Sequence, residues 1–158
     1  MPAVKWIGLL LLLACGVGTG VTLLRFERRR YLQAEGFLAL LRTVRLDIDC
    51  FSMPVDRILR QCDPRLLVAC GVTQPAADMR ALLDRARLYL PEEFCRLLWD
   101  FAAQLGTGYR ADQLRCCDYY LARLEPFCDQ MRAELPKREK MAFLLPSAVA
   151  AVLSLMLL

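Results

Sequence analysis

Apolar and thiol side chains recur between residues 114 and 135 at alternating steps of three and four positions. This period places them on one narrow stripe of an α-helix of about six turns. Three heptads with two cysteines are marginal for a coiled coil, so we expect the stripe to pack within the chain, over residues 94–105. Asp112 is the expected start of this helix, and Pro126 falls on its outward face. The stripe consists of Leu114, Cys117, Leu121, Leu124, Cys128, Met131 and Leu135.

Helical spacing marks further segments between residues 26 and 106, and no segment alternates like a strand. The sequence therefore predicts an all-α fold with a helical bundle in the middle of the chain. Capping aspartates, prolines and glycines set the expected helix boundaries. The expected helices are 26–50, a short helix after Met53-Pro54, a helix opened by Asp63-Pro64 and closed by Gly71, residues 73–90, and residues 91–105 closed by Gly106.

Each expected helix has an inward face of apolar or thiol side chains at positions three or four apart. These faces together predict one hydrophobic core. Its expected members are Phe37, Leu41, Val44, Ile48, Val55, Ile58, Leu59, Cys62, Met79, Leu82, Leu83, Ala86, Leu90, Phe94, Leu97, Leu98, Phe101 and Leu105, together with the stripe.

Both ends of the chain are apolar and are flanked by basic residues on the side of the middle segment. Residues 6–24 and 141–158 are each about long enough to cross a bilayer as a helix. Basic residues favour the cytoplasmic side of a membrane. The pattern predicts a transmembrane helix at 6–24, a cytoplasmic helical domain at 25–140 and a second transmembrane helix at 141–158. The flanking basic residues are Arg25, Arg28, Arg29, Arg30, Lys137, Arg138 and Lys140.

An alternative interpretation concerns Cys15. The sequence LLAC at residues 12–15, followed by Gly16, is typical of a bacterial lipoprotein cleavage site. Lipidation there would make the chain an extracytoplasmic binding module anchored through Cys15. Seven cysteines would then face an oxidising space, and the apolar run also continues past the site, so we favour the transmembrane helix.

The charge and the missing histidine exclude several classes of function. Residues 31–136 contain 13 arginines and 15 acidic residues, so the body lacks the basic surplus of a nucleic-acid-binding domain. Without histidine there is no imidazole base, Ser-His pair or His metal ligand. The acidic pairs 47/49 and 92/93 do not face each other on a helix, and we expect a solvated face and a helix-dipole role for them.

The eight cysteines include no CxxC motif, and most of those in the body fall on apolar helical faces. Free cysteine behaves as a small buried hydrophobe, so we expect reduced thiols in a cytosolic core. A metal site, a redox site or a membrane enzyme that uses a cysteine is the alternative. Cys117 lies on the stripe and Cys116 lies off it, which predicts core packing for Cys117 and partial exposure for Cys116.

Three motifs resemble a known family. They are LRTVRLDIDCFSMPVDRIL (Leu41–Leu59), FAAQLGTGYRADQ (Phe101–Gln113) and the basic run with the apolar tail, KREKMAFLLPSAVAAVLSLMLL (Lys137–Leu158). In order and spacing the chain is similar to stage III sporulation protein AB of endospore-forming bacteria. It departs from that family at Leu145, Pro146 and Ala148, where the family has glycines.

The resemblance implies a non-enzymatic platform or scaffold in the secretion-like channel complex between mother cell and forespore. It places the chain in the membrane on the mother-cell side, with the central domain in the cytoplasm. The domain of that family is similar to the inner-membrane platform protein of type II secretion systems. The implied partners are other membrane proteins of the complex and its ATPase, with no nucleic acid, no small-molecule substrate and no cofactor. No catalytic, cofactor-binding or metal-binding residue carries over.

Overall fold

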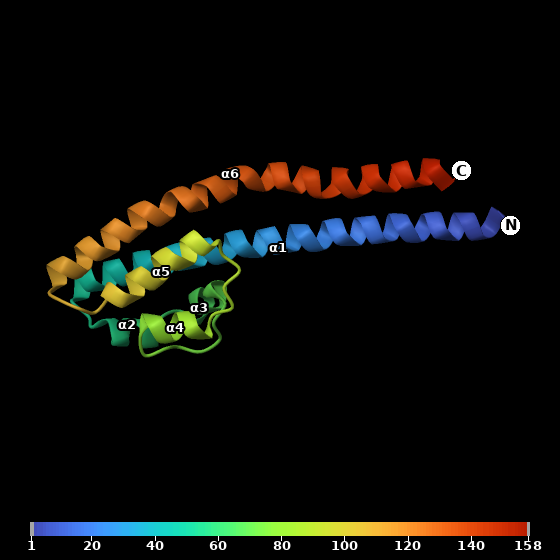
Figure 1. Cartoon of the computed structure of the whole chain (residues 1–158). Coiled ribbons are helices and arrows are strands. Elements are labelled where there is room, and N and C mark those ends of the chain that lie inside the picture. Colours follow the sequence, from blue (N-terminus) through green and yellow to red (C-terminus); the bar gives the residue numbers. More distant parts are fainter. Residues whose placement is uncertain (1, 158) are drawn as a thin grey trace. The chain divides into compact units, whose positions relative to one another are not determined.

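The computed structural model consists of six α-helices, and the residues it describes contain no strand, which confirms the all-α prediction (Figure 1). It describes the backbone of residues 2–157 and the side chains of residues 8, 14–16, 18–142, 144, 148, 149 and 152. The helices are α1 (Pro2–Phe51), α2 (Val55–Gln61), α3 (Pro64–Cys70), α4 (Met79–Arg85), α5 (Glu92–Gln104) and α6 (Arg110–Leu157).

The chain divides into two compact units. Unit 1 comprises residues 1–29 and 132–158, and unit 2 comprises residues 30–131. Both expected membrane spans fall in unit 1, where the backbone is helical from Pro2 and as far as Leu157. Most side chains of these spans, including those of Trp6, Leu145 and Pro146, lie outside the described residues. In the part of the chain that the structure describes, no helix has a stretch both long and apolar enough to cross a membrane.

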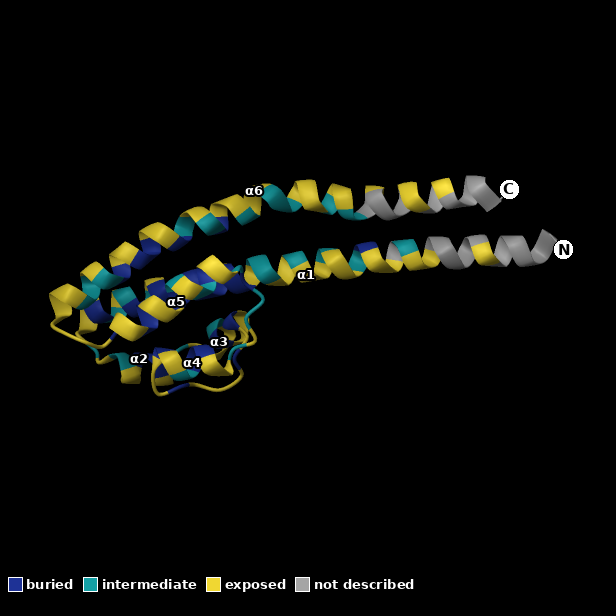
Figure 2. Cartoon of the chain, in the orientation of Figure 1, coloured by how far each residue is buried: buried dark blue, intermediate teal, exposed yellow. Residues whose placement is uncertain are grey.

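The core of unit 2 is formed by the inward faces of all six helices (Figure 2). Phe37, Phe94 and Phe101 are its largest fully buried side chains. The expected inward faces are confirmed with one exception: every member but Leu135 is buried or packs half-buried against the core, and Leu135 belongs to unit 1. The sequence pattern missed Leu40, Leu67, Cys70, Val72 and Tyr120, which are also buried.

Most expected helix boundaries are also confirmed. Helix α1 ends at Phe51, where Ser52 takes a positive φ of 50° before Met53-Pro54. The Asp63 carboxylate caps α3 by accepting a hydrogen bond from the Arg65 N–H at 2.8 Å. Gly71 closes α3 with a φ of 86°, a conformation that glycine adopts without steric cost.

Four expected boundaries change, and two of them belong to the helix expected at 73–90, which is the main error. Only Met79–Arg85 is helical there, because the Asp78 carboxylate caps its start by accepting from the Ala81 N–H at 2.6 Å. Ala86 leaves the helix with an extended backbone, so residues 86–91 form a linker. Helix α5 is capped by Leu105 rather than Gly106, which follows with a φ of 84°. Helix α6 starts at Arg110, two residues before the expected Asp112.

The apolar stripe of α6 packs within the chain, as expected. Cys117, Leu121, Leu124 and Cys128 are buried in unit 2, and Pro126 is exposed. Beside the stripe, the Tyr120 ring packs edge-on against Phe101 of α5, with ring centroids 5.5 Å apart. The stripe contacts α5 as predicted, and polar contacts on its flank reach α1 as well, which the sequence pattern did not indicate.

Helix α3 crosses close to α1 at Gly36. A Cβ atom built at Gly36 would lie 2.9 Å from both the Cβ and the carbonyl carbon of Ala69. Since part of the obstacle is backbone, a side chain at this position would push α3 away from α1. Glycine is unfavourable inside a helix by roughly 1 kcal/mol relative to alanine, and here it permits the contact between the two helices.

Candidate functional site

The structure brings together six of the seven predicted membrane-flanking basic residues in unit 1. Arg25, Arg28 and Arg29 of α1 and Lys137, Arg138 and Lys140 of α6 are all exposed. We call these six residues the basic collar. Arg30, the seventh, is half-buried and is the first residue of unit 2.

Ion pairs join the two helices of unit 1 at the basic collar. Arg138 donates from Nη1 to Glu27 Oε1 on α1 at 2.9 Å and from Nη2 to Glu134 Oε2 on its own helix at 2.8 Å. Arg28 Nε lies 3.9 Å from Glu139 Oε1. The hydrogen bond to Glu134 and the charge of Glu27 raise the pKa of Arg138. The collar therefore has a structural role that the sequence did not indicate, because it links the segments flanking the two apolar ends.

The net charge of the chain is concentrated in unit 1. Unit 1 contains eight basic and three acidic residues, a net charge of +5, whereas unit 2 contains 13 basic and 14 acidic residues. Of the eight basic residues, only Lys5 lies outside the ranges 25–29 and 132–140. The surplus of positive charge at residues 25–29 and 132–140 attracts anions to this part of unit 1.

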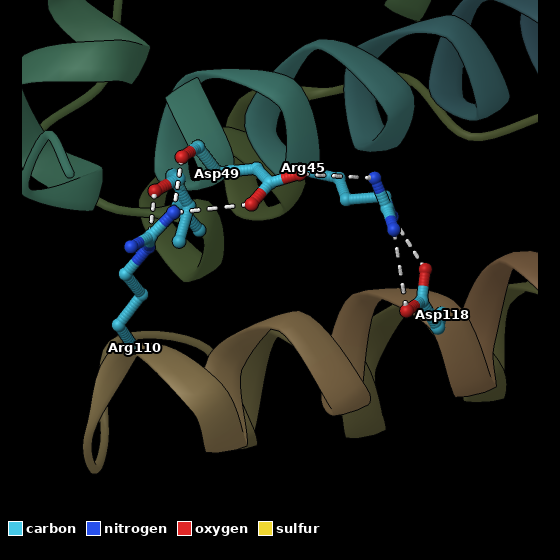
Figure 3. Close-up of polar contacts among 5 residues, drawn as sticks. Arg45, Asp49, Arg110 and Asp118 are labelled. Carbon is cyan, nitrogen blue, oxygen red and sulfur yellow. Dashed lines mark hydrogen bonds and ion pairs between the residues drawn. The ribbon is translucent and has the colours of Figure 1, made fainter. Parts of the chain in front are cut away.

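Within unit 2, ion pairs form a ladder between α1 and α6 (Figure 3). Arg45 Nε donates to Asp118 Oδ1 at 2.5 Å, and this hydrogen bond with the Asp118 charge raises the pKa of Arg45. Arg42 donates to Glu125 at 2.7 Å. These pairs are exposed, and such pairs typically contribute about 0.2–1 kcal/mol each. The main effect of the ladder is therefore to set the antiparallel register of α1 and α6, and its contribution to the free energy of unfolding is small.

Arg110 makes the most extensive contact of the ladder. Its guanidinium donates to the backbone carbonyls of Ile48 and Asp49, with Nε 3.1 Å from the Ile48 oxygen, and Nη2 lies 3.1 Å from the Asp49 carboxylate. Carbonyls in the last turn of a helix carry partial negative charge, and the Ile48 carbonyl accepts from the Ser52 N–H at 3.2 Å as well as from Arg110. Arg110 thus caps α1 and ties its end to the first turn of α6. Asp49, expected to be only solvated, pairs with this cation.

A buried polar network centres on Gln33 of α1, whose side chain is 4% exposed. Its Nε2 donates to the carbonyls of Cys70 at 3.0 Å and Arg87 at 2.7 Å, and its Oε1 accepts from the Tyr89 N–H at 2.9 Å. The side chain satisfies backbone groups that a helix would otherwise satisfy. Sequence reasoning missed Gln33, because a single glutamine in a helix carries no pattern.

The cysteines show no arrangement for nucleophilic chemistry in the described part of the chain. All eight are free thiols. Burial raises the pKa of Cys70 and Cys117 to about 12 and that of Cys128 to about 11, and it also raises the pKa of the half-buried Cys116. The thiolate is the nucleophile, so these groups are poorly reactive near neutral pH. No group of three or more His, Cys, Asp or Glu among the described residues could hold a metal ion.

These observations define the class of the protein: an all-α chain with a helical module, unit 2, held by a buried glutamine network and an interhelical ion-pair ladder. The family model described as stage III sporulation protein AB matches residues 75–158, from the linker before α4 to the last residue. The chain therefore belongs to the stage III sporulation protein AB family, and this family gives it a role in sporulation. No curated protein and no solved structure matches it.

Proposed function

We propose that the protein is a non-enzymatic, membrane-anchored assembly component of the channel complex between mother cell and forespore. The match of residues 75–158 to the sporulation family carries this proposal. The matched region includes the whole ion-paired half of α6 and the apolar tail, so the proposal concerns how unit 2 is attached as well as what it does. An extracytoplasmic module anchored through Cys15 is the outcome that would replace it.

Membrane attachment is proposed from the sequence. Residues 6–24 and 141–158 are apolar, and basic residues flank both on the side of unit 2. The positive-inside rule supports a cytoplasmic position for unit 2, and we propose that this cytoplasm is that of the mother cell. The ion pairs between Glu27 and Arg138 and between Arg28 and Glu139 support a hairpin, because they hold the two flanking segments together.

A scaffold role is supported by where the polar groups of unit 2 are used. Gln33 and Arg110 contact helix ends and a linker, and Arg42 and Arg45 connect two helices. Each of these contacts positions helices. A rigid module of this kind suits a protein that offers a binding surface to others. The partners we propose are other membrane proteins of the complex and its ATPase.

The placement of unit 2 is tested by labelling cysteines in intact cells with a membrane-impermeant maleimide. Cys50 at the end of α1 is exposed and is the reporter, since Cys116 is half-buried with a raised pKa. Cys15 is kept because the lipoprotein alternative requires it, the other six cysteines are changed to alanine, and the same chain with C50A gives the background labelling. We expect Cys50 to be labelled only after the cells are permeabilised. Rapid labelling of intact cells would place unit 2 outside and support the lipoprotein alternative.

The assembly role is tested by sporulation with crosslinking. A strain lacking the protein should form few heat-resistant spores, and the cysteine-free variant should restore them. Recovery by the cysteine-free variant excludes a cysteine-dependent enzyme. A photo-crosslinking residue at Val68, exposed on α3, should then capture a membrane protein or the ATPase of the complex. Normal spore counts in the deletion strain would contradict the proposal.

A further inference from the structure

A pocket of about 400 Å³ lies between α1 and α6 within unit 1. Its volume falls in the range of small-molecule sites, about 300–1,000 Å³. Five apolar side chains and three charged ones line it. The lining residues are Leu23, Leu24, Leu135, Met141, Ala142, Glu27, Arg138 and Glu139.

The pocket is amphipathic along the helix axes. Leu23 and Leu24 of α1 lie toward its N-terminus, and Met141 and Ala142 of α6 lie toward its C-terminus; the two termini are at the same end of unit 1 (Figure 1). Glu27 and Arg138 lie about one helical turn further from the two termini, and an ion pair of 2.9 Å joins them. Leu23 and Met141 are 55% and 62% exposed, so apolar surface remains uncovered beside an ion-paired level.

Arg138 is the only cation among the described residues that line the pocket, and the other members of the basic collar lie within two positions of lining residues in the sequence. The lining acids Glu27 and Glu139 pair with Arg138 and Arg28. Four further members of the basic collar are exposed, and none of the ion pairs found among the described residues involves them. They are Arg25, Arg29, Lys137 and Lys140. With a net charge of +5 in unit 1, the complementary ligand is an anion with an apolar tail.

We propose that this pocket binds one anionic diacyl phospholipid, with an acyl chain against Leu23, Leu24, Met141 and Ala142 and the headgroup phosphate at the basic collar. Guanidinium and ammonium groups form strong charge-assisted hydrogen bonds with phosphate oxygens. Basic clusters beside a membrane segment attract anionic lipids. The inference rests on the membrane attachment proposed above and adds a lipid partner to it.

The experiment measures which lipids remain bound to the full chain. The protein is purified in detergent, exchanged into mixed micelles of phosphatidylglycerol and phosphatidylcholine, and analysed by native mass spectrometry. We expect one retained phosphatidylglycerol per chain in preference to phosphatidylcholine. Equal retention of the two lipids by the unaltered chain would overturn the proposal.

Two pairs of variants separate the charged and apolar parts of the site. R29Q/K137Q/K140Q removes three of the cations that have no ion pair among the described residues and should lower the preference for phosphatidylglycerol by about fivefold per cation, or on the order of a hundredfold. Its matched control, R57Q/R60Q/R96Q, removes the same charge from exposed positions of unit 2 and should retain the preference. A142W fills the pocket and should abolish retention of either lipid, whereas A148W, on an exposed part of the same helix, should not.

Failure of this inference is distinguishable from failure of the proposed membrane attachment. Extraction of cell membranes with alkaline carbonate tests attachment alone, and a chain that stays in the pellet is anchored. A chain that is anchored but retains both lipids equally, or whose preference survives both R29Q/K137Q/K140Q and A142W, disproves the lipid site and leaves the proposed function intact.

Discussion

Gln33 accepts a hydrogen bond from the backbone N–H of Tyr89, 56 positions further along the chain, at 2.9 Å. The same side chain donates to the carbonyls of Cys70 and Arg87, so one amide connects α1 with the end of α3 and with the linker before α5. Gly71 makes room for it, because a Cβ atom there would lie 2.8 Å from Gln33 Nε2. Residues 86–91 are not helical, and Gln33 bonds two of their backbone groups.

Replacing Gln33 with methionine should destabilise unit 2 strongly. Methionine keeps the length and the apolar volume of the side chain but leaves one backbone N–H and two carbonyls without their partner. Each buried group left unsatisfied costs about 1–3 kcal/mol, so for three groups we expect a loss of at least about 3 kcal/mol in the free energy of unfolding. Urea unfolding of the full chain in detergent, followed by tryptophan fluorescence, measures it. Q61M at the exposed end of α2 is the matched control, and an equal effect of Q61M and Q33M would contradict the network.

Replacing Gly36 with alanine should also destabilise unit 2, although alanine is the better helix former by about 1 kcal/mol. The new Cβ would meet Ala69 at 2.9 Å, and overpacking of this kind costs roughly 1–3 kcal/mol. A69G should rescue G36A only in part, because the Ala69 carbonyl carbon and oxygen remain 2.9 Å and 3.0 Å from that Cβ position. A G36A variant more stable than the unaltered protein would show that α3 does not pack as closely as described.

Arg110 and Arg42 should differ in how much they stabilise the protein, although each joins α1 to α6 by an ion pair. R110M removes both the ion pair and the contacts with the Ile48 and Asp49 carbonyls, and a cation at the C-terminal end of a helix stabilises it by about 0.3–1 kcal/mol, up to about 2 kcal/mol. R42M removes an exposed ion pair alone, worth about 0.2–1 kcal/mol.

Salt distinguishes the two contributions. In 1 M sodium chloride the effect of R42M on the urea midpoint should nearly disappear, since the Debye length is then about 3 Å. Part of the R110M effect should remain, because hydrogen bonds to helix carbonyls are less sensitive to screening. If high salt abolished both effects equally, the carbonyl cap would contribute nothing measurable.

The helices and the core were predictable because they depend on local patterns. The period of the stripe from Leu114 to Met131 identified the buried face of α6, and Asp63, Pro64 and Gly71 marked the ends of α3. The helix expected at 73–90 was wrong because apolar spacing continued through Ala86 and Leu90, which are half-buried and buried in a linker. A linker that lies on the core can have the same burial pattern as a helix, and the hydrogen bonds that hold this one come in part from the distant Gln33.

The sequence predicted which basic residues belong to the candidate site but not how they are arranged. The sequence identified each basic residue of the collar, yet it could not indicate that Arg138 faces Glu27, 111 positions away. The pocket between α1 and α6 likewise depends on which faces of two helices meet. Such contacts between distant segments have no signature in one sequence, whereas a run of arginines after an apolar stretch has one.

Alkaline pH should destabilise unit 2 through its buried thiols. Cys70, Cys117 and Cys128 have pKa values of about 12, 12 and 11 in the folded protein, against an ordinary value near 9. Between pH 9 and 11 the unfolded chain therefore loses protons that the folded chain retains. The stabilisation is complete below pH 9 and is lost as the pH rises toward the folded pKa values.

We expect the urea midpoint to fall between pH 8 and pH 10.5, and to fall less in the variant C70A/C117A/C128A. Each thiol contributes at most about 1.4 kcal/mol per pH unit to the slope. Variants with one cysteine changed give the same comparison if the triple variant does not fold. C50A, at the exposed end of α1, is the control and should leave the slope unchanged. A slope that is the same in every variant would show that tyrosine or lysine titration causes the alkaline loss, since burial of the three thiols would then contribute nothing to it.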